Sequence, residues 1–166
     1  GLHYMRISDV NLRKLLWALT SKLKTLPHLS EHTIVNVLFG LSSLPSDIPE
    51  VLQVFRVMTA KLSNDLPTLT SIGLGSVLHH MKQKSTDTQH VRQFIAAVAQ
   101  CIPKMTEPLD GRSLSAAMGG FRNFSGDHAE VRRLLAALHS KTLSSNVQLD
   151  ARAVDHIVFN LRNMSI

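Results

Sequence analysis

The chain has 166 residues, of which 44% are hydrophobic and 18% are charged, with a formal net charge of +6 and a pI near 9.9. This composition is that of a basic chain able to fold, and its longest apolar stretches fall well below the roughly 18 residues of a membrane-spanning helix, so no membrane partner is expected. The single Cys101 excludes an internal disulfide and a cysteine-based metal site, which favours a reducing compartment.

A repeat with a period of forty positions organises the chain from its first residues onward. Laying the sequence over itself at this shift aligns apolar columns such as Leu29/Leu69/Leu109/Leu149, Ile34/Leu74/Leu114/Val154, Leu38/Leu78/Met118/Val158 and Val51/Val91/Val131. The register gives a partial repeat at 1–28, repeats at 29–68, 69–108 and 109–148, and a partial repeat at 149–166. This self-similarity predicts a single all-α domain, an α-solenoid of stacked helix-turn-helix repeats.

The apolar spacing predicts two helices in each repeat and no strand. In chain order the expected helices lie near 9–25, 31–44, 48–64, 70–84, 88–104, 110–124, 128–143 and 150–164. Ser30, Thr70, Asp110 and Asp150 are suitable N-caps for the first helix of each repeat. Asp47 with Glu50, and Asp127 with Glu130, have the spacing of a capping box for the second helix.

Both ends of the sequence fall inside a repeat, so we expect an internal window of a longer array. Leu2 and Met5 at one end, with Val158 and Leu161 at the other, belong to core columns that lack their outer neighbours. These side chains should therefore contact residues beyond the window or a second chain.

Several conspicuous residues have structural interpretations. Gly40 and Gly120 share a column and predict close approach of helices, and Trp17 is expected in the core among leucines. His79 and His80 have no carboxylate or cysteine at ligand spacing, so no metal site is predicted. No nucleophile stands with a base, and a catalytic site has little reason to recur in every repeat, so neither an enzyme nor a cofactor is expected.

Acidic and basic residues are distributed differently along the repeats. Most acids fall at predicted helix starts, where they cap the helix or complement its dipole. The cations lie in mid-helix or near helix ends: Arg13, Lys14, Lys22, Lys24, Arg56, Lys61, Lys82, Lys84, Arg92, Arg122, Arg132, Arg133, Lys141 and Arg162. The body of the array is therefore expected to present positive faces, as an anionic partner requires.

A cationic column and an amide column run side by side at the end of the first helices. The cationic column contains Lys82, Arg122 and Arg162, and the amide column contains Gln83, Asn123 and Asn163. Cations bind phosphate, and amides offer the paired donor and acceptor that reads a base edge, so these residues are candidate RNA contacts. Further candidates on the same side are Arg112, Arg152, His32, Asn36 and His156. Capping and solvation of helix ends explain the columns equally well.

The units LSEHTIVNVLFGLSSLPSDIPEVLQVF and LDGRSLSAAMGGFRNFSGDHAEVRRLLAAL give the chain a family resemblance. The chain resembles the octotricopeptide and heptatricopeptide helical-repeat proteins, which are relatives of the RAP-domain proteins. The resemblance implies an α-solenoid that binds RNA in mitochondria or chloroplasts, acting on transcripts or with organellar ribosomes.

Two functions of different kinds follow from the sequence. The first is a non-catalytic RNA-binding repeat protein of organellar RNA metabolism or of an organellar ribosome. The alternative is a protein-interaction scaffold similar to HEAT and armadillo arrays. Because phosphate contacts release counterions, salt-dependent binding to single-stranded RNA would distinguish the first from the second.

Overall fold

The structure is a computed structural model that describes residues 10–162 and residue 164. Within these residues the chain forms eight α-helices and no β-strand, so the predicted all-α class is confirmed. The helices are α1 (Val10–Thr25), α2 (Glu31–Leu41), α3 (Pro49–Asn64), α4 (Ser71–His79), α5 (Gln89–Cys101), α6 (Gly111–Gly119), α7 (Ala129–Ser144) and α8 (Ala151–Leu161). Two 3₁₀ helices, η2 (Ile102–Lys104) and η3 (Gly120–Asn123), follow α5 and α6.

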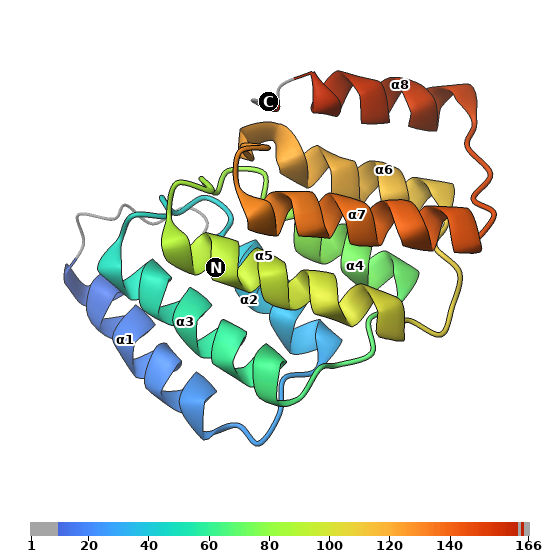
Figure 1. Cartoon of the computed structure of the whole chain (residues 1–166). Coiled ribbons are helices and arrows are strands. Elements are labelled where there is room, and N and C mark those ends of the chain that lie inside the picture. The colour runs from blue at the N-terminus through green and yellow to red at the C-terminus, as the bar shows by residue number, and fades with distance from the viewer. Residues whose placement is uncertain (1–9, 163, 165–166) are drawn as a thin grey trace.

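The helices pack in two rows (Figure 1). Helices α2, α4, α6 and α8 contact one another in that order and form what we call the even row. Helices α1, α3, α5 and α7 do the same and form the odd row. Each helix therefore has the helix two positions along the chain as a main neighbour.

The predicted apolar columns fill the core between the rows. Buried members include Leu29, Leu69, Leu109, Ile34, Leu74, Leu114, Leu38, Leu78, Met118, Val51, Val91 and Val131. Helix α8 differs, since none of its residues is buried and Val154 and Val158 are 45% and 61% exposed. Trp17 is 48% exposed, so its predicted place in the core is wrong; Leu12 and Leu16 contact the core from α1 instead. Leu2 and Met5 lie outside the described residues.

The four predicted N-caps of the even row are confirmed. The side chains of Ser30, Thr70, Asp110 and Asp150 each accept a hydrogen bond from the backbone N–H three residues ahead, at 3.2, 2.9, 2.8 and 2.7 Å. The first residue of one helix also binds the cap of the next. The Glu31 carboxylate accepts from Thr70 N and Thr70 Oγ1, and Ser71 Oγ donates to Asp110 Oδ2 at 2.7 Å. The caps thus join neighbouring helices of the row as well as starting them.

The predicted capping boxes of the odd row are wrong. Helix α3 begins at Pro49 after Ile48, and α7 begins after His128, and neither of these N-cap residues makes a side-chain capping bond. The Asp127 carboxylate accepts instead from Ser125 Oγ at 3.0 Å, and Ser125 Oγ accepts from Asp127 N at 3.2 Å. The acid therefore orders the loop before the helix rather than its first turn.

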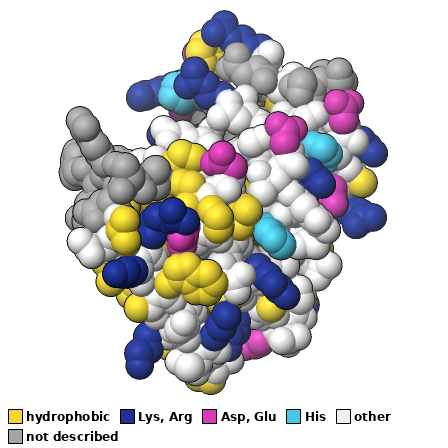
Figure 2. Space-filling model, turned by 90° about the vertical axis from the view of Figure 1, so that its left-hand side faces the viewer, with side chains coloured by type: hydrophobic (Ala, Val, Ile, Leu, Met, Phe, Trp, Pro, Cys, Tyr) yellow, Lys and Arg dark blue, Asp and Glu magenta, His cyan; other side chains and the backbone are white. Residues whose placement is uncertain are grey.

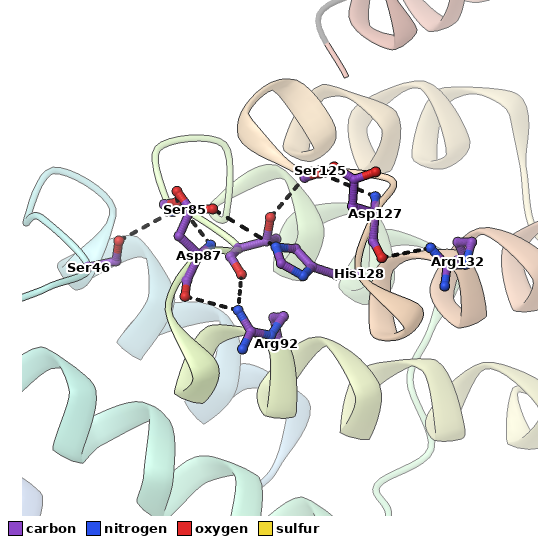
Figure 3. A network of polar contacts seen from close by, with 9 residues as sticks. Ser46, Ser85, Asp87, Arg92, Ser125, Asp127, His128 and Arg132 are labelled. Atoms are coloured by element: carbon purple, nitrogen blue, oxygen red, sulfur yellow. Dashed lines mark hydrogen bonds and ion pairs between the residues drawn. The ribbon is translucent and has the colours of Figure 1, made fainter. Parts of the chain in front are cut away.

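This loop arrangement recurs in the preceding repeat and links the two loops to each other (Figure 3). Ser85 and Asp87 make the same exchange of hydrogen bonds as their equivalents one repeat later. The guanidinium groups of Arg92 and Arg132 each donate to two backbone carbonyls of their own loop. Between repeats, Ser46 Oγ accepts from Ser85 N at 3.2 Å, and Thr86 Oγ1 accepts from Ser125 N at 2.9 Å. Arg92 and Arg132 thus hold the loops in shape.

The two glycines of one column have different neighbours. A Cβ on Gly120 would lie 1.9 Å from Leu78 O, which confirms the predicted close approach there. A Cβ on Gly40 would meet nothing within 4 Å, so the same prediction is wrong for Gly40. The reason is position: Gly120 faces the preceding helix of the even row, whereas no helix precedes α2 in that row among the described residues.

Candidate nucleic-acid interface

Helices α4 and α6 end earlier than predicted, at His79 and Gly119 rather than near 84 and 124. The backbone tightens there into bonds between residues three apart, with Met81 N donating to Leu78 O and Phe124 N donating to Phe121 O, both at 2.9 Å. These turns place Lys82 and Arg122 just beyond the helix ends. Both side chains line the same surface hollow.

This hollow, which we call the even-row groove, lies between α6 and α8 and reaches the end of α4. It has a volume of about 970 Å³. Small residues of α6 form part of its lining, including Ser115, Ala116 and Gly119. The equivalent residues of α2 are Val35, Asn36 and Phe39. The smaller side chains of α6 leave the space that those larger ones would occupy.

Four cations line the groove. Arg112 and Arg152 lie in the first turns of α6 and α8, and Lys82 and Arg122 lie at the opposite ends of the helices. Among the described residues none of these four forms an ion pair with a carboxylate, and the one acid in the lining is Asp150. The Asp150 carboxylate is engaged as the α8 N-cap, where it accepts from Ala153 N at 2.7 Å. The groove therefore has a surplus of positive charge that could bind an anion.

Polar side chains without a permanent charge lie between the two pairs of cations. They are His79, Ser115, His156 and Asn160. Burial, and then the nearby Lys82 ammonium, lower the pKa of His79 below its ordinary value, while a backbone hydrogen bond at Ala116 opposes the shift. His79 is therefore mostly neutral at pH 7, and its ring offers one donor and one acceptor nitrogen.

The groove brings together five of the eleven residues predicted from the sequence as RNA contacts. These are Lys82, Arg112, Arg122, Arg152 and His156. The sequence analysis missed His79, Ser115 and Asn160 as members of the same surface. A signal was available for His79, because it shares a column with Gly119 on the outer side of the even row.

The other predicted residues lie elsewhere. Asn123 Nδ2 donates to Lys82 O at 2.9 Å, so this amide joins two repeats, and Gln83 is exposed outside the groove lining. Arg162 is the C-cap of α8, and its guanidinium lies 3.9 Å from the centre of the Phe159 ring of the same helix. His32 and Asn36 hydrogen-bond to each other on α2 at 2.8 Å. Asn163 lies outside the described residues.

Lys84 does not belong to the positive surface predicted for it. Its side chain is fully buried, and its amine donates to the carbonyls of Leu41 and Leu44 at the end of α2. Burial lowers the pKa of this amine to about 8. Its column otherwise holds Leu44, Phe124 and Met164, so a lysine here replaces a core side chain and binds carbonyls at and just after a helix end.

Two other kinds of site are absent from residues 10–162. No group of three or more His, Cys, Asp or Glu side chains in this range could hold a metal ion. No helix in the described part of the chain has the length and apolarity needed to cross a bilayer. Comparison with known proteins finds no matching family model, no matching curated protein and no matching solved structure.

Proposed function

We propose that the chain is a non-catalytic RNA-binding protein built as an α-solenoid of forty-residue repeats, and that the even-row groove holds the RNA. The burial of the repeat columns and the hydrogen bonds between residues 39 positions apart support the repeat architecture. A solenoid presents its recognition surface as a series of equivalent helix faces. The even row is such a series, and the groove lies on it.

The observation that carries the proposal is the set of four groove cations, none of which has a carboxylate partner among the described residues. A cation of this kind on a protein surface is available to replace the counterions of a phosphate, which is the main source of affinity for nucleic acid. The hollow form favours a single strand, because an unpaired strand can enter a groove and expose its bases there. A duplex would present a convex row of phosphates to the rim alone.

The setting of this activity follows from the family resemblance. Proteins of the octotricopeptide and heptatricopeptide type bind transcripts or ribosomal RNA in mitochondria and chloroplasts. We propose an organellar location and a role in transcript metabolism or in an organellar ribosome. Fluorescent tagging of the full-length protein in its own cells would test the location, and a cytosolic signal would contradict it.

The RNA-binding proposal is tested by removing two cations from the groove. Replacing Arg112 and Arg152 with Gln keeps the helices intact, because both residues are exposed in first turns. The salt slope is the slope of the logarithm of the binding constant against the logarithm of the salt concentration. Each lost phosphate contact should reduce the size of this slope by about 0.7 for a single strand, so the double variant should lose about 1.4. Fluorescence anisotropy with a labelled single-stranded RNA, between about 50 and 200 mM salt, gives the slope.

A matched control removes the same charge from the opposite row. Lys14 and Arg133 are exposed on α1 and α7 and lie outside the groove, so replacing both with Gln should leave most of the slope intact. Equal losses in the two double variants would mean that RNA binding follows net charge and that the groove is not the binding site.

The alternative function, a protein-interaction scaffold similar to HEAT and armadillo arrays, has its own supporting observation. Figure 2 shows apolar side chains gathered among Lys and Arg on the left-hand face of the view in Figure 1, where α1 lies. Leu15 and Leu19 of α1 are 45% and 49% exposed, and α8 exposes Val154 and Val158. Exposed apolar groups of this kind favour a protein partner. Binding to such a partner with little salt dependence, and no binding to RNA, would favour the scaffold.

A further inference from the structure

The centre of the even-row groove is an opening above Gly119. A Cβ at this position would lie 3.5 Å from His79 Nδ1 and 3.9 Å from Asn160 Nδ2. Both nitrogens are therefore within van der Waals contact of the same point in space. Polar groups from α4 and α8 thus approach each other over a residue of α6 that has no side chain.

Both flanking side chains have hydrogen-bonding capacity left. Asn160 Nδ2 uses one hydrogen to donate to His156 O at 2.7 Å, and its second hydrogen and its carbonyl oxygen remain available. The His79 ring has a backbone hydrogen bond at Ala116 and keeps its other nitrogen for a base. An amide that donates and accepts, with a ring nitrogen beside it, can match the edge of a nucleobase, whereas cations alone cannot distinguish one base from another.

The position of the opening relative to the cations suits an RNA strand. Gly119 lies seven residues after Arg112 and three residues before Arg122, which corresponds to roughly 10 Å and 5 Å along the helix axis. Cations thus stand on both sides of the opening. A strand whose phosphates contact them would hold a base over Gly119.

We infer that His79 and Asn160 contact an unpaired nucleobase of single-stranded RNA that enters the opening over Gly119. This inference rests on the proposed RNA binding. It assigns base recognition to a histidine and an asparagine from α4 and α8, the two helices of the even row that flank α6, and leaves Arg112, Arg152, Lys82 and Arg122 to hold phosphates.

The sharpest test is Gly119→Ala. The added methyl would meet its neighbours at ordinary contact distances, and Gly119 has a right-handed helical backbone, so the variant should fold normally and keep every cation. The measurement is binding of short oligomers of U, A and C and of an abasic ribose-phosphate oligomer of the same length. The methyl should reduce the preference of the protein for the best base-containing oligomer over the abasic one.

His79→Ala and Asn160→Ala provide the second measurement. Each should weaken binding of the preferred oligomer by about 5- to 100-fold, which corresponds to the loss of a good base contact, and leave abasic binding and the salt slope unchanged. His139→Ala is the matched control, because His139 is exposed on α7 in the odd row and lies outside the groove lining. It should bind all oligomers as the unaltered protein does.

The outcomes separate this inference from the proposed function. Salt-dependent RNA binding with an unchanged preference in all three groove variants would overturn the base contact and leave the RNA proposal in place. Failure of the unaltered protein to bind any oligomer would overturn both. Tighter binding of an oligoglutamate peptide than of RNA would also overturn both, and would assign the groove to an acidic protein segment.

Discussion

Gly120→Ala is expected to destabilise the fold strongly, although it adds a single methyl group. The new Cβ would stand 1.9 Å from Leu78 O and 2.5 Å from Leu78 C, and both are backbone atoms of α4 that no rotamer change can move. Relief requires α4 and the segment after α6 to separate by more than about 1 Å, because a carbon and an oxygen in ordinary contact lie about 3.2 Å or more apart. That shift would open the interface between neighbouring helices of the even row.

We expect Gly120→Ala to lower the free energy of unfolding by about 3 kcal/mol, at the upper end of the cost of overpacking. Gly40→Ala is the matched control, because it makes the same substitution in the same repeat column where no atom lies within 4 Å. Alanine is the better helix former, so Gly40→Ala should raise the free energy of unfolding by up to about 1 kcal/mol.

Urea unfolding followed by circular dichroism measures both variants, and the change appears as a shift of the midpoint at constant slope. Opposite signs are the expected result. The reasoning would be refuted if Gly120→Ala cost less than about 1 kcal/mol, or if both variants changed stability in the same direction by similar amounts.

Three further predictions concern buried or bonded polar groups. The folded-state pKa of Lys84 is about 8 and its unfolded value is 10.5, so the unfolded chain binds more protons between these two pH values. The contribution of Lys84 to the free energy of unfolding should therefore increase by about 3 kcal/mol as the pH rises through this window. The test compares the free energy of unfolding in urea of the unaltered protein and of Lys84→Met at the two ends of the window. The comparison is needed because Cys101, whose pKa is raised to about 11, contributes an opposite change in both proteins. Equal pH dependence of the two proteins would contradict the buried charge. The Glu50 carboxylate is buried and paired with Arg13 at 2.8 Å, and burial raises its pKa less than the Arg13 hydrogen bond and the other favourable contacts lower it. Arg13→Met should therefore lower the free energy of unfolding by about 1 to 2 kcal/mol at pH 7, which is less than the cost of breaking a fully buried pair because the Arg13 side chain is 48% exposed. The cost should be smaller below pH 4.5, where Glu50 can take a proton. A cost in urea unfolding that does not change with pH would count against the pair. Asn123→Ala should lower stability by about 1 kcal/mol, since it removes the bond to Lys82 O, and should leave base preference unchanged; a changed preference would restore the base-reading role predicted from the sequence.

The sequence by itself determined the elements and their order. Helix periodicity, the repeat columns and the four N-caps depend on residues a few positions apart or on simple recurrence, so local pattern was enough to predict them. The failed capping boxes mark the limit of that reasoning. Asp47 and Asp127 have the right spacing to an acid three residues on, but Pro49 and Ala129 begin the helices later than the pattern assumes, and the Asp127 carboxylate bonds to the loop.

The sequence also determined that positive charge would exceed negative charge on the helix bodies, because most acids are placed at helix starts. It could not determine which cations meet. Lys82 and Lys84 stand two residues apart, yet one lines the groove and the other is fully buried. The tight turn after α4 repeats every three residues, so it buries Met81 and Lys84 and leaves Lys82 and Gln83 toward the surface. Arg122 and Arg152 belong to different repeats and line one hollow, because small residues of α6 leave room between helices that only tertiary packing brings together. Local sequence thus determined the helices, and contacts between repeats decided which of their polar side chains form a surface.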